Sequence, residues 1–285
     1  MRPHLFCFGM GYTARVLANR LAAEGWRIEG TSRNPEAVAD SGCPIHRFER
    51  RRPLPVEILS GVTHILVSVP PQPDGDPVLD CHGGEIAATP GLAWVGYLST
   101  TSVYGDRSGA WVDETAELRP TGERGRRRVS AEADWLDLHR ERGVPTHIFR
   151  LAGIYGPGRS ALDTVRAGTA KRVDKPGQVF SRAHVEDIAS VLHASMTRPR
   201  PGAVYNVCDD EPASPAAVIE EAARLLGRPM PPLVPFEAAA LSPMARSFYD
   251  DNKRVSNERI KRELGLTLRY PNYRAGLAAI LAAGD

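Results

Sequence analysis

Near its start the chain changes abruptly from an apolar run into a glycine-rich turn, and this feature most constrains the fold. Residues 5–8 form the run, which predicts a buried strand, and Gly9 permits the tight turn that follows it. Gly11 has no Cβ to keep a pyrophosphate from the backbone, and Ala14 lets the next helix pack closely against the strand. That helix would present its first N–H groups to phosphates. The pattern predicts a dinucleotide site with contacts from Gly9, Gly11, Tyr12, Thr13 and Ala14.

The end of the second expected strand indicates which dinucleotide binds. Residues 26–31 predict this strand, and Ser32 and Arg33 follow where such folds place the residue that reads the ribose. An NAD site usually has an acid there, whereas a hydroxyl and a guanidinium suit the 2′-phosphate of NADP. We therefore expect NADP, with NAD still possible and S-adenosylmethionine disfavoured. The alternative is that Arg33 is a solvated loop charge. Glu29, within the strand, is expected to point elsewhere.

Strands and helices alternate along the rest of the chain. This order predicts an α/β fold, a Rossmann-type doubly wound parallel sheet with a smaller C-terminal substrate lobe. Further strands are expected at residues 45–48, 63–69, 92–98 and 145–151, and helices near 78–88, before Gly143, and from Ser214 to Gly227. The proline-rich tract 229–235 is expected to be a connection within the lobe.

Composition narrows the class of protein. The chain has 285 residues and a net charge of +2, which gives no reason to expect nucleic acid as a partner. No apolar run reaches the ~18 residues of a membrane span, and no secretory leader precedes the first strand, so we expect no membrane partner and a cytoplasmic location. The four cysteines are widely scattered. They predict reduced thiols and no metal site.

Several motifs, in order along the chain, carry a resemblance to a known family. They are Gly-x-Gly-x-x-Ala at 9–14, Leu-Ser-Thr-Thr-Ser-Val-Tyr-Gly-Asp at 98–106, Arg-Leu-Ala-Gly-Ile-Tyr-Gly-Pro-Gly at 150–158, His-Val-Glu-Asp-Ile-Ala at 184–189 and Tyr-Asn-Val at 205–207. Together they resemble the extended short-chain dehydrogenase/reductases, the NAD-dependent epimerase/dehydratase group. The glycine spacing resembles the atypical branches of that group.

The resemblance implies a nicotinamide cofactor and a Ser/Thr–Tyr–Lys catalytic set. Thr100 takes the hydroxyl position, which polarises the substrate oxygen; alternatively it is a strand-end threonine that bonds only backbone. Further cofactor contacts are implied at strand ends: Val67, Ser68, Val69, Ser99, Leu151, Ala152 and Ile154. The resemblance also implies a Rossmann domain of residues 1–155 plus about 182–207. The smaller lobe then comprises about 156–181 and 208–285.

Arginines stand where the other two catalytic residues are expected. The register set by Ala131-Glu132 places the tyrosine position at Arg124 and the lysine position at Arg128. Arg128 can still bond ribose hydroxyls, but neither guanidinium can exchange a proton at neutral pH. Arg124, Arg126, Arg127 and Arg128 form either a solvated, helix-initiating charge run or, for one or two of them, a clamp on an anionic substrate or cofactor phosphate.

Other tyrosines, and one lysine, are candidates for the roles of the missing catalytic tyrosine and lysine. Tyr104 and Tyr155 are candidate catalytic residues and His184 a further titratable group, although packed side chains are the more ordinary interpretation. Tyr249-x-x-x-Lys253 spells the catalytic pair. We expect it to lie beyond the last helix of the lobe, far from Val103-Tyr104-Gly105, and to be a decoy.

Two functions remain open from the sequence. One is an NADP-dependent oxidoreductase or epimerase/dehydratase acting on a small polar or sugar-like molecule, with specificity set between 156–179 and residues after Cys208. The other is a non-catalytic NADP-binding redox sensor or regulator. The arginines favour the second, and the retained Thr100 favours the first. The family alone implies a possible homodimer.

Overall fold

A parallel sheet forms the centre of the fold in the computed structural model, which describes residues 2–284. It contains seven strands in the order β11-β7-β5-β4-β1-β2-β3. Their bounds are β1 His4–Phe8, β2 Arg27–Ser32, β3 Ile45–Arg47, β4 His64–Val67, β5 Trp94–Thr100, β7 Thr146–Leu151 and β11 Val204–Val207. Strand β1 runs parallel to both β2 and β4, and β4 runs parallel to β5. This confirms the Rossmann-type α/β fold.

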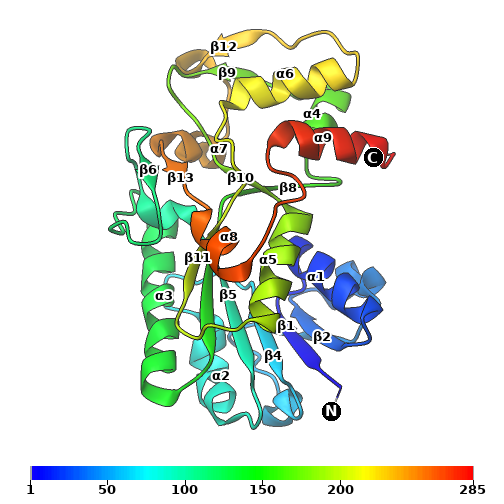
Figure 1. The fold of residues 1–285 in the computed structure, drawn as a ribbon, viewed down its shortest axis with the longest axis vertical. Coiled ribbons are helices and arrows are strands. Elements are labelled where there is room, and N and C mark those ends of the chain that lie inside the picture. Colours follow the sequence, from blue (N-terminus) through cyan, green and yellow to red (C-terminus); the bar gives the residue numbers. More distant parts are fainter. Residues whose placement is uncertain (1, 285) are drawn as a thin grey trace. The chain divides into compact units, whose positions relative to one another are not determined.

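Helices cover both faces of this sheet (Figure 1): α1 Tyr12–Ala23, α2 Pro77–Ala88, α3 Glu123–Arg142 and α5 Val185–Thr197. Side chains of α2 and α3, such as Val78 and Trp135, share one core with Phe6 and Phe8 of β1. On the other face, Trp94 of β5 donates its indole N–H to Ser195 of α5 at 3.0 Å. With both faces covered, nearly every residue of β1, β4, β5 and β7 is buried, as parallel sheets require.

Contacts divide the chain into two compact units. The first comprises Met1–Thr100, Glu123–Arg150 and Ile188–Tyr205, and the second Thr101–Gly122, Leu151–Asp187 and Asn206–Asp285. The loop Thr101–Gly122 thus groups with the second unit, whereas the sequence places it in the dinucleotide-binding domain. Residues 151–155 and 182–187 are assigned differently in the same way.

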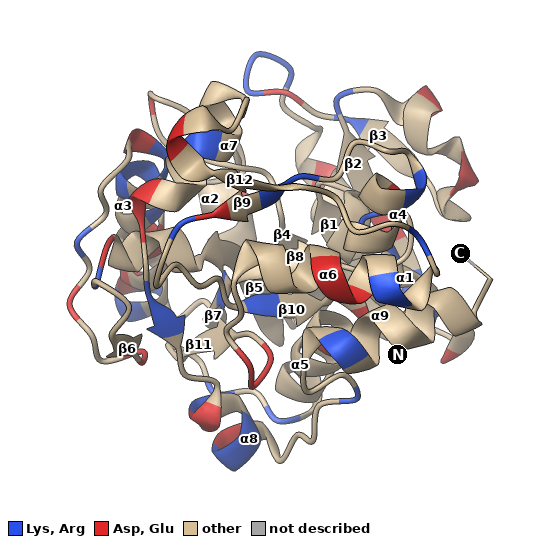
Figure 2. Ribbon diagram, turned by 90° about the horizontal axis from the view of Figure 1, so that it is seen from above, with Lys and Arg blue, Asp and Glu red and all other residues tan. Residues whose placement is uncertain are grey.

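The second unit is built from short elements. They are β6 Trp111–Val112, β8 Gly153–Tyr155, α4 Ala161–Arg166, β9 Arg172–Asp174, β10 Arg182–His184, α6 Pro215–Leu225, β12 Leu233–Pro235, α7 Pro243–Ser247, β13 Arg254–Val255, α8 Glu258–Leu264 and α9 Tyr273–Ala282. The tract expected to be a connection contributes β12, which pairs with β9. Helices α6 and α8 each carry acidic and basic residues (Figure 2), and Arg224 pairs with Glu221 on α6 as Lys261 does with Glu258 on α8.

One sequence expectation about this unit is wrong in two ways. The Tyr249-x-x-x-Lys253 segment is not far from Val103-Tyr104-Gly105, because Lys253 donates to the Gly105 carbonyl at 3.0 Å. Tyr249 and Lys253 do not follow the last helix, because α8 and α9 come after them. Helix α8 is only seven residues long, which is too short for a clear hydrophobic period, although Gly265 ends it in the left-handed conformation. No helix within residues 2–284 has the length and apolar character needed to cross a membrane.

Candidate functional site

The glycine turn lies where the strand order of the sheet reverses. Strand β1 has β2 on one side and β4 on the other, and ligands of such sheets bind at the carboxyl ends of these strands. Gly9 adopts φ +92°, and a Cβ there would lie 2.6 Å from the Ser68 hydroxyl that follows β4. That hydroxyl donates to the Gly9 carbonyl at 2.6 Å. Position 9 therefore requires glycine, both because of its positive φ and because Ser68 leaves no room for a Cβ.

Gly11 differs from Gly9 because its surroundings are open. It is the N-cap residue of α1, with extended backbone, and a Cβ built on it meets nothing within 4 Å. Among the described residues, no side chain caps the helix and no acid occupies its first turn. Uncapped N–H groups at the positive end of a helix favour an anion, so the geometry fits a pyrophosphate.

Strand β2 ends against this turn. Thr31 accepts the Gly9 N–H at its hydroxyl, at 2.8 Å, and the Met10 N–H at its carbonyl, at 2.7 Å. Ser32 then forms a local turn with Asn34. Arg33 is exposed and forms no hydrogen bond or ion pair with any residue between 2 and 284.

Glu29 points away from this edge, as expected. Its carboxylate is buried and pairs with Arg27 at 2.5 Å and with His46 at 2.9 Å. The acid of β2 is therefore committed within the protein, and the side chains that follow the strand are a hydroxyl and a guanidinium.

The carboxyl end of β5 carries the candidate hydroxyl, Thr100, which is half-buried. The preceding Ser99 is buried and donates its hydroxyl to Glu132 of α3 at 2.5 Å. Glu132 also pairs with Arg150 of β7 at 2.7 Å, and both side chains are almost completely buried. The proton of the Ser99 hydroxyl is therefore donated to Glu132 and not to a cofactor.

Helix α3 directs one of the four arginines, Arg128, toward β5. Arg124, Arg128 and Glu132 are spaced by four residues and so share one helix face. The Arg128 guanidinium donates to the Leu98 carbonyl and, at 3.2 Å, to the Tyr97 hydroxyl. Burial raises the pKa of Tyr97. The lysine position of the motif therefore holds a cation two residues from Thr100.

The other two arginines of the cluster form ion pairs within their own helix. Arg126 and Arg127 each pair with Glu123 at 3.1 Å on the exposed side of the first helical turn. A solvated, helix-initiating charge run describes these two. The clamp hypothesis is thereby narrowed to Arg124 and Arg128.

The tyrosines weighed as substitutes are engaged inside the second unit. Tyr104 is fully buried and donates to Asn206 at 2.7 Å. Tyr155 donates to the Asn272 carbonyl at 3.4 Å, and its ring packs edge-on against His184. Burial raises the pKa of Tyr155 and lowers that of His184 to about 4. Packed side chains account for these contacts, and a catalytic role for either tyrosine stays a prediction.

The remaining predicted contacts belong to strand ends. In the first unit, Val67 is buried and Val69 packs at the margin of the core. In the second unit, Leu151 and Ala152 are buried and Ile154 is half-buried. Their contacts with a cofactor stay predictions.

Sequence analysis missed a buried acid, Asp209. It follows β11 in Cys208-Asp209-Asp210 and is 3% exposed, and within the described chain neither carboxylate oxygen accepts a hydrogen bond. Burial raises its pKa to about 7, opposed by Arg182. Two acids directly after an apolar strand were the available signal. Asp209 also lines a cavity of about 610 Å³ beside Trp111 and Lys261.

Comparisons with known proteins agree with this architecture. The model of the NAD-dependent epimerase/dehydratase family matches residues 85–208. A solved structure described as a functionally unknown conserved protein from Silicibacter pomeroyi is 57% identical, with a TM-score of 0.91 and 99% of each chain covered.

Two curated proteins are more distant relatives. Protein YeeZ of Escherichia coli is 29% identical over 283 residues, covering 93% of this chain and 95% of its own. A 3-diazoavenalumate denitrifying reductase of a Streptomyces species is 28% identical over 219 residues, covering 72% of this chain and 60% of its own. With its Rossmann-type sheet and its glycine turn, the chain is thus similar to the NAD-dependent epimerase/dehydratase family, whose model matches residues 85–208.

Proposed function

We propose that the protein is an NADP-dependent oxidoreductase that acts on a small, polar, negatively charged substrate without a tyrosine acid. The observation that carries the cofactor preference is Arg33, which is exposed and forms no ion pair with residues 2–284, at the end of β2 where NAD enzymes usually place an acid. A guanidinium with no internal partner can form charge-assisted hydrogen bonds with a 2′-phosphate. Ser32 would add a hydroxyl to the same phosphate.

The rest of the cofactor would bind where the backbone is open. The N-terminus of α1, with Gly11 leaving space and no side-chain cap in the described chain, suits the pyrophosphate. Arg128 of α3, which is bonded to Leu98 near the end of β5, would bond the ribose hydroxyls in place of the family's lysine. When bound, the nicotinamide would supply or accept hydride.

The substrate would be oriented by Thr100 and stabilised by charge. The Thr100 hydroxyl would donate to the substrate oxygen, while Arg124 and Arg128 would balance the negative charge that develops there. Because a guanidinium does not release its proton at neutral pH, water would protonate the product. This favours substrates with an anionic group that the arginines can also bind. The reductase among the relatives supports redox chemistry over epimerisation.

The alternative is an NADP-binding sensor that does not turn over. It is favoured by one observation, the arginines at both positions that the family's proton transfer needs. Its cofactor site would be the same, so binding alone does not separate the two proposals.

One experiment separates them. The protein is titrated with NADPH and with NADH by fluorescence, and absorbance at the reduced-nicotinamide band is then followed with carboxylated carbonyl compounds, their neutral esters and sugar nucleotides. We expect NADPH to bind more tightly than NADH and a carboxylated substrate to be reduced faster than its ester. Equal affinity for the two dinucleotides would exclude the NADP preference. Tight binding with no turnover on the panel would favour the sensor.

A further inference from the structure

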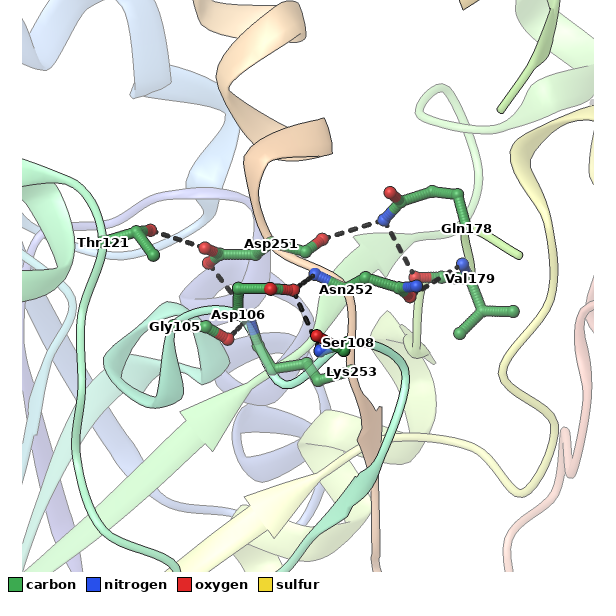
Figure 3. A network of polar contacts seen from close by, with 9 residues as sticks. All are labelled: Gly105, Asp106, Ser108, Thr121, Gln178, Val179, Asp251, Asn252 and Lys253. Carbon is green, nitrogen blue, oxygen red and sulfur yellow. Dashed lines mark hydrogen bonds and ion pairs between the residues drawn. The ribbon is translucent and has the colours of Figure 1, made fainter. Parts of the chain in front are cut away.

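Lys253, the lysine of the Tyr249-x-x-x-Lys253 sequence, is buried and binds a main-chain carbonyl and a carboxylate. Its ammonium donates to the Gly105 carbonyl at 3.0 Å and pairs with Asp251 at the same distance (Figure 3). Only 9% of Lys253 is exposed, and burial lowers its pKa while Asp251 raises it. Tyr249 packs instead against Phe180 and Phe236. The two residues therefore do not act as a tyrosine–lysine pair.

Asn252, the neighbour of Lys253, is bonded on all sides. Its carbonyl accepts the N–H groups of Arg107 and Gly109, both at 2.9 Å, and its own N–H donates to Asp106 at 2.8 Å. Its side chain donates to the Gly177 carbonyl at 3.0 Å and accepts the Val179 N–H at 3.2 Å. One asparagine thus joins two segments that are far apart in the sequence.

Asp251 completes the arrangement. Its carboxylate accepts the Thr121 hydroxyl at 2.5 Å, and its carbonyl accepts the side-chain amide of Gln178 at 2.8 Å (Figure 3). Residues 251–253, which we call the clasp, therefore hold the loop Thr101–Gly122 near its start, at Gly105, and near its end, at Thr121. All of these contacts lie within the second unit.

The loop has little freedom at the point where Lys253 holds it. Gly105 adopts φ +65°, and a Cβ there would lie 1.8 Å from the Arg119 carbonyl oxygen. Only glycine fits between these backbone segments. The turn after Tyr104 is thus held by Arg119 on one side and by Lys253 on another.

The ends of this loop are the two places to which the proposed function assigns chemistry. Thr100, the last residue of β5, directly precedes the loop, and Glu123, which begins α3 ahead of Arg124, directly follows it. A shift of the loop would move the hydroxyl and the first turn of the arginine-bearing helix. Misplacement of reacting groups by about 1 Å can lower a rate by about 100-fold.

We propose that Asp251, Asn252 and Lys253 are positioning residues, which set the place of Thr100 and of the start of α3 by holding the loop between them. The proposal rests on the proposed function for its effect on turnover. It assigns no contact with substrate or cofactor to the clasp. It accounts for a charged, buried lysine that the family's catalytic motif does not explain.

The test compares Lys253→Met, Asn252→Ala and Asp251→Asn/Lys253→Met with wild type. Lys261→Met is the control, because Lys261 pairs with Asp210 and Glu258 in the same unit but outside the clasp. The double variant removes both charges and so avoids an unpaired buried carboxylate. Hydrogen exchange over residues 105–121, NADPH affinity, and kcat and KM are measured for each.

We expect at least tenfold faster exchange over residues 105–121 in the clasp variants, NADPH affinity within about twofold of wild type, and kcat at least tenfold lower. The Lys261→Met control should match wild type in all three. Lys253→Arg, which keeps a donor for Gly105, should recover part of kcat.

Unchanged exchange over 105–121 in folded variants would overturn the proposal whatever the activity. Faster exchange with kcat unchanged would overturn the positioning role. Absence of wild-type turnover would count against the proposed function alone, because the exchange comparison needs no substrate and still decides whether the clasp holds the loop.

Discussion

Two ends of the dinucleotide-binding unit differ in how they present themselves to a ligand. At the α1 end, the backbone is bare: Gly11 faces open space, and the helix has no side-chain cap among residues 2–284. At the α3 end, a side chain is found in place of bare backbone: the Arg128 guanidinium donates to the Leu98 carbonyl of β5. At the first end the ligand is thus indicated by backbone geometry, whereas at the second the proposed chemistry depends on side chains.

The largest effect is expected at the α3 end. Glu132→Ala removes the carboxylate that balances buried Arg150 and accepts Ser99. An uncompensated buried charge costs about 3 to 5 kcal/mol. Urea denaturation should show that loss in the free energy of unfolding. Glu123→Ala, at an exposed pair on the same helix, should change it by less than about 1 kcal/mol. Similar losses for the two variants would contradict the prediction.

The α1 end should respond in binding rather than in stability. Gly11→Val places a side chain in open space, so we expect an unchanged melting temperature and roughly 100-fold weaker NADPH binding, since the side chain would block the pyrophosphate. Fluorescence titration measures the affinity. Gly9→Ala is the contrasting variant, because its Cβ would lie 2.6 Å from Ser68 at φ +92°. It should lower the melting temperature, and NADPH binding unaltered by Gly11→Val would refute the site.

The buried acid Asp209, whose carboxylate accepts no hydrogen bond from residues 2–284, offers a contrast with Glu132. The pKa of Asp209 is raised from 3.8 to about 7. Between these two pH values the folded protein keeps a proton on Asp209 that the unfolded chain has lost. The stabilisation from the neutral form is present at pH 4 and is lost as the pH rises toward 7 and above. Asp209→Asn should therefore become more stabilising between pH 5 and pH 8, by about 2 kcal/mol.

Thermal or urea unfolding at pH 5, 6.5 and 8 checks this sign. Asp113→Asn offers a control, because hydrogen bonds from Thr115 lower the pKa of that exposed acid. The control should not become more stabilising as the pH rises. A gain at pH 5 that disappears at pH 8 would reverse the expected sign for Asp209.

At the β5 end, Arg128→Lys tests whether the cation or its geometry matters. Lysine keeps the charge but not the planar guanidinium, whose Nη1 donates to both Leu98 and Tyr97. We expect kcat to fall by roughly tenfold and NADPH affinity by less than about threefold. Steady-state kinetics with the best substrate measures both. Arg126→Lys, on an exposed arginine paired with Glu123, should leave kcat unchanged.

The smallest expected change is at Arg33. Arg33→Ala removes an unpaired, exposed guanidinium, so stability should not change, and NADPH should bind about tenfold more weakly, as the loss of one charge-assisted contact predicts. NADH affinity should stay within twofold. An equal loss for both dinucleotides would show that Arg33 does not read the 2′-phosphate.

The sequence predicted most of the first unit. The strand, turn and helix at residues 4–23 and the later strands have strong local patterns, and the structure contains them within a few residues. The candidate positions of Thr100 and Arg128 also follow from motifs, and Arg128 does lie against the end of β5. These features are local in sequence, so a pattern can report them.

The second unit was harder to predict. Helix α8 is short, and β12 was hidden in a proline-rich tract that pairs with a distant strand. The clasp joins Lys253 to Gly105 and Thr121 to Asp251, across more than 100 residues. No local spacing of residues predicts such contacts. The Tyr-x-x-x-Lys pattern is typical of a catalytic pair, whereas Lys253 holds a loop.

By itself the sequence determined the ligand class, because Gly9, Gly11 and the small Ala14 are requirements of backbone conformation and close approach. It also predicted that arginines stand where the family's catalytic tyrosine and lysine are expected. Only the tertiary structure decided that Arg128 is bonded to β5 whereas Arg126 and Arg127 both pair with Glu123, and that Lys253 is buried against Gly105. Such partners are brought together by folding, so the role of each charge depends on contacts that no single segment encodes.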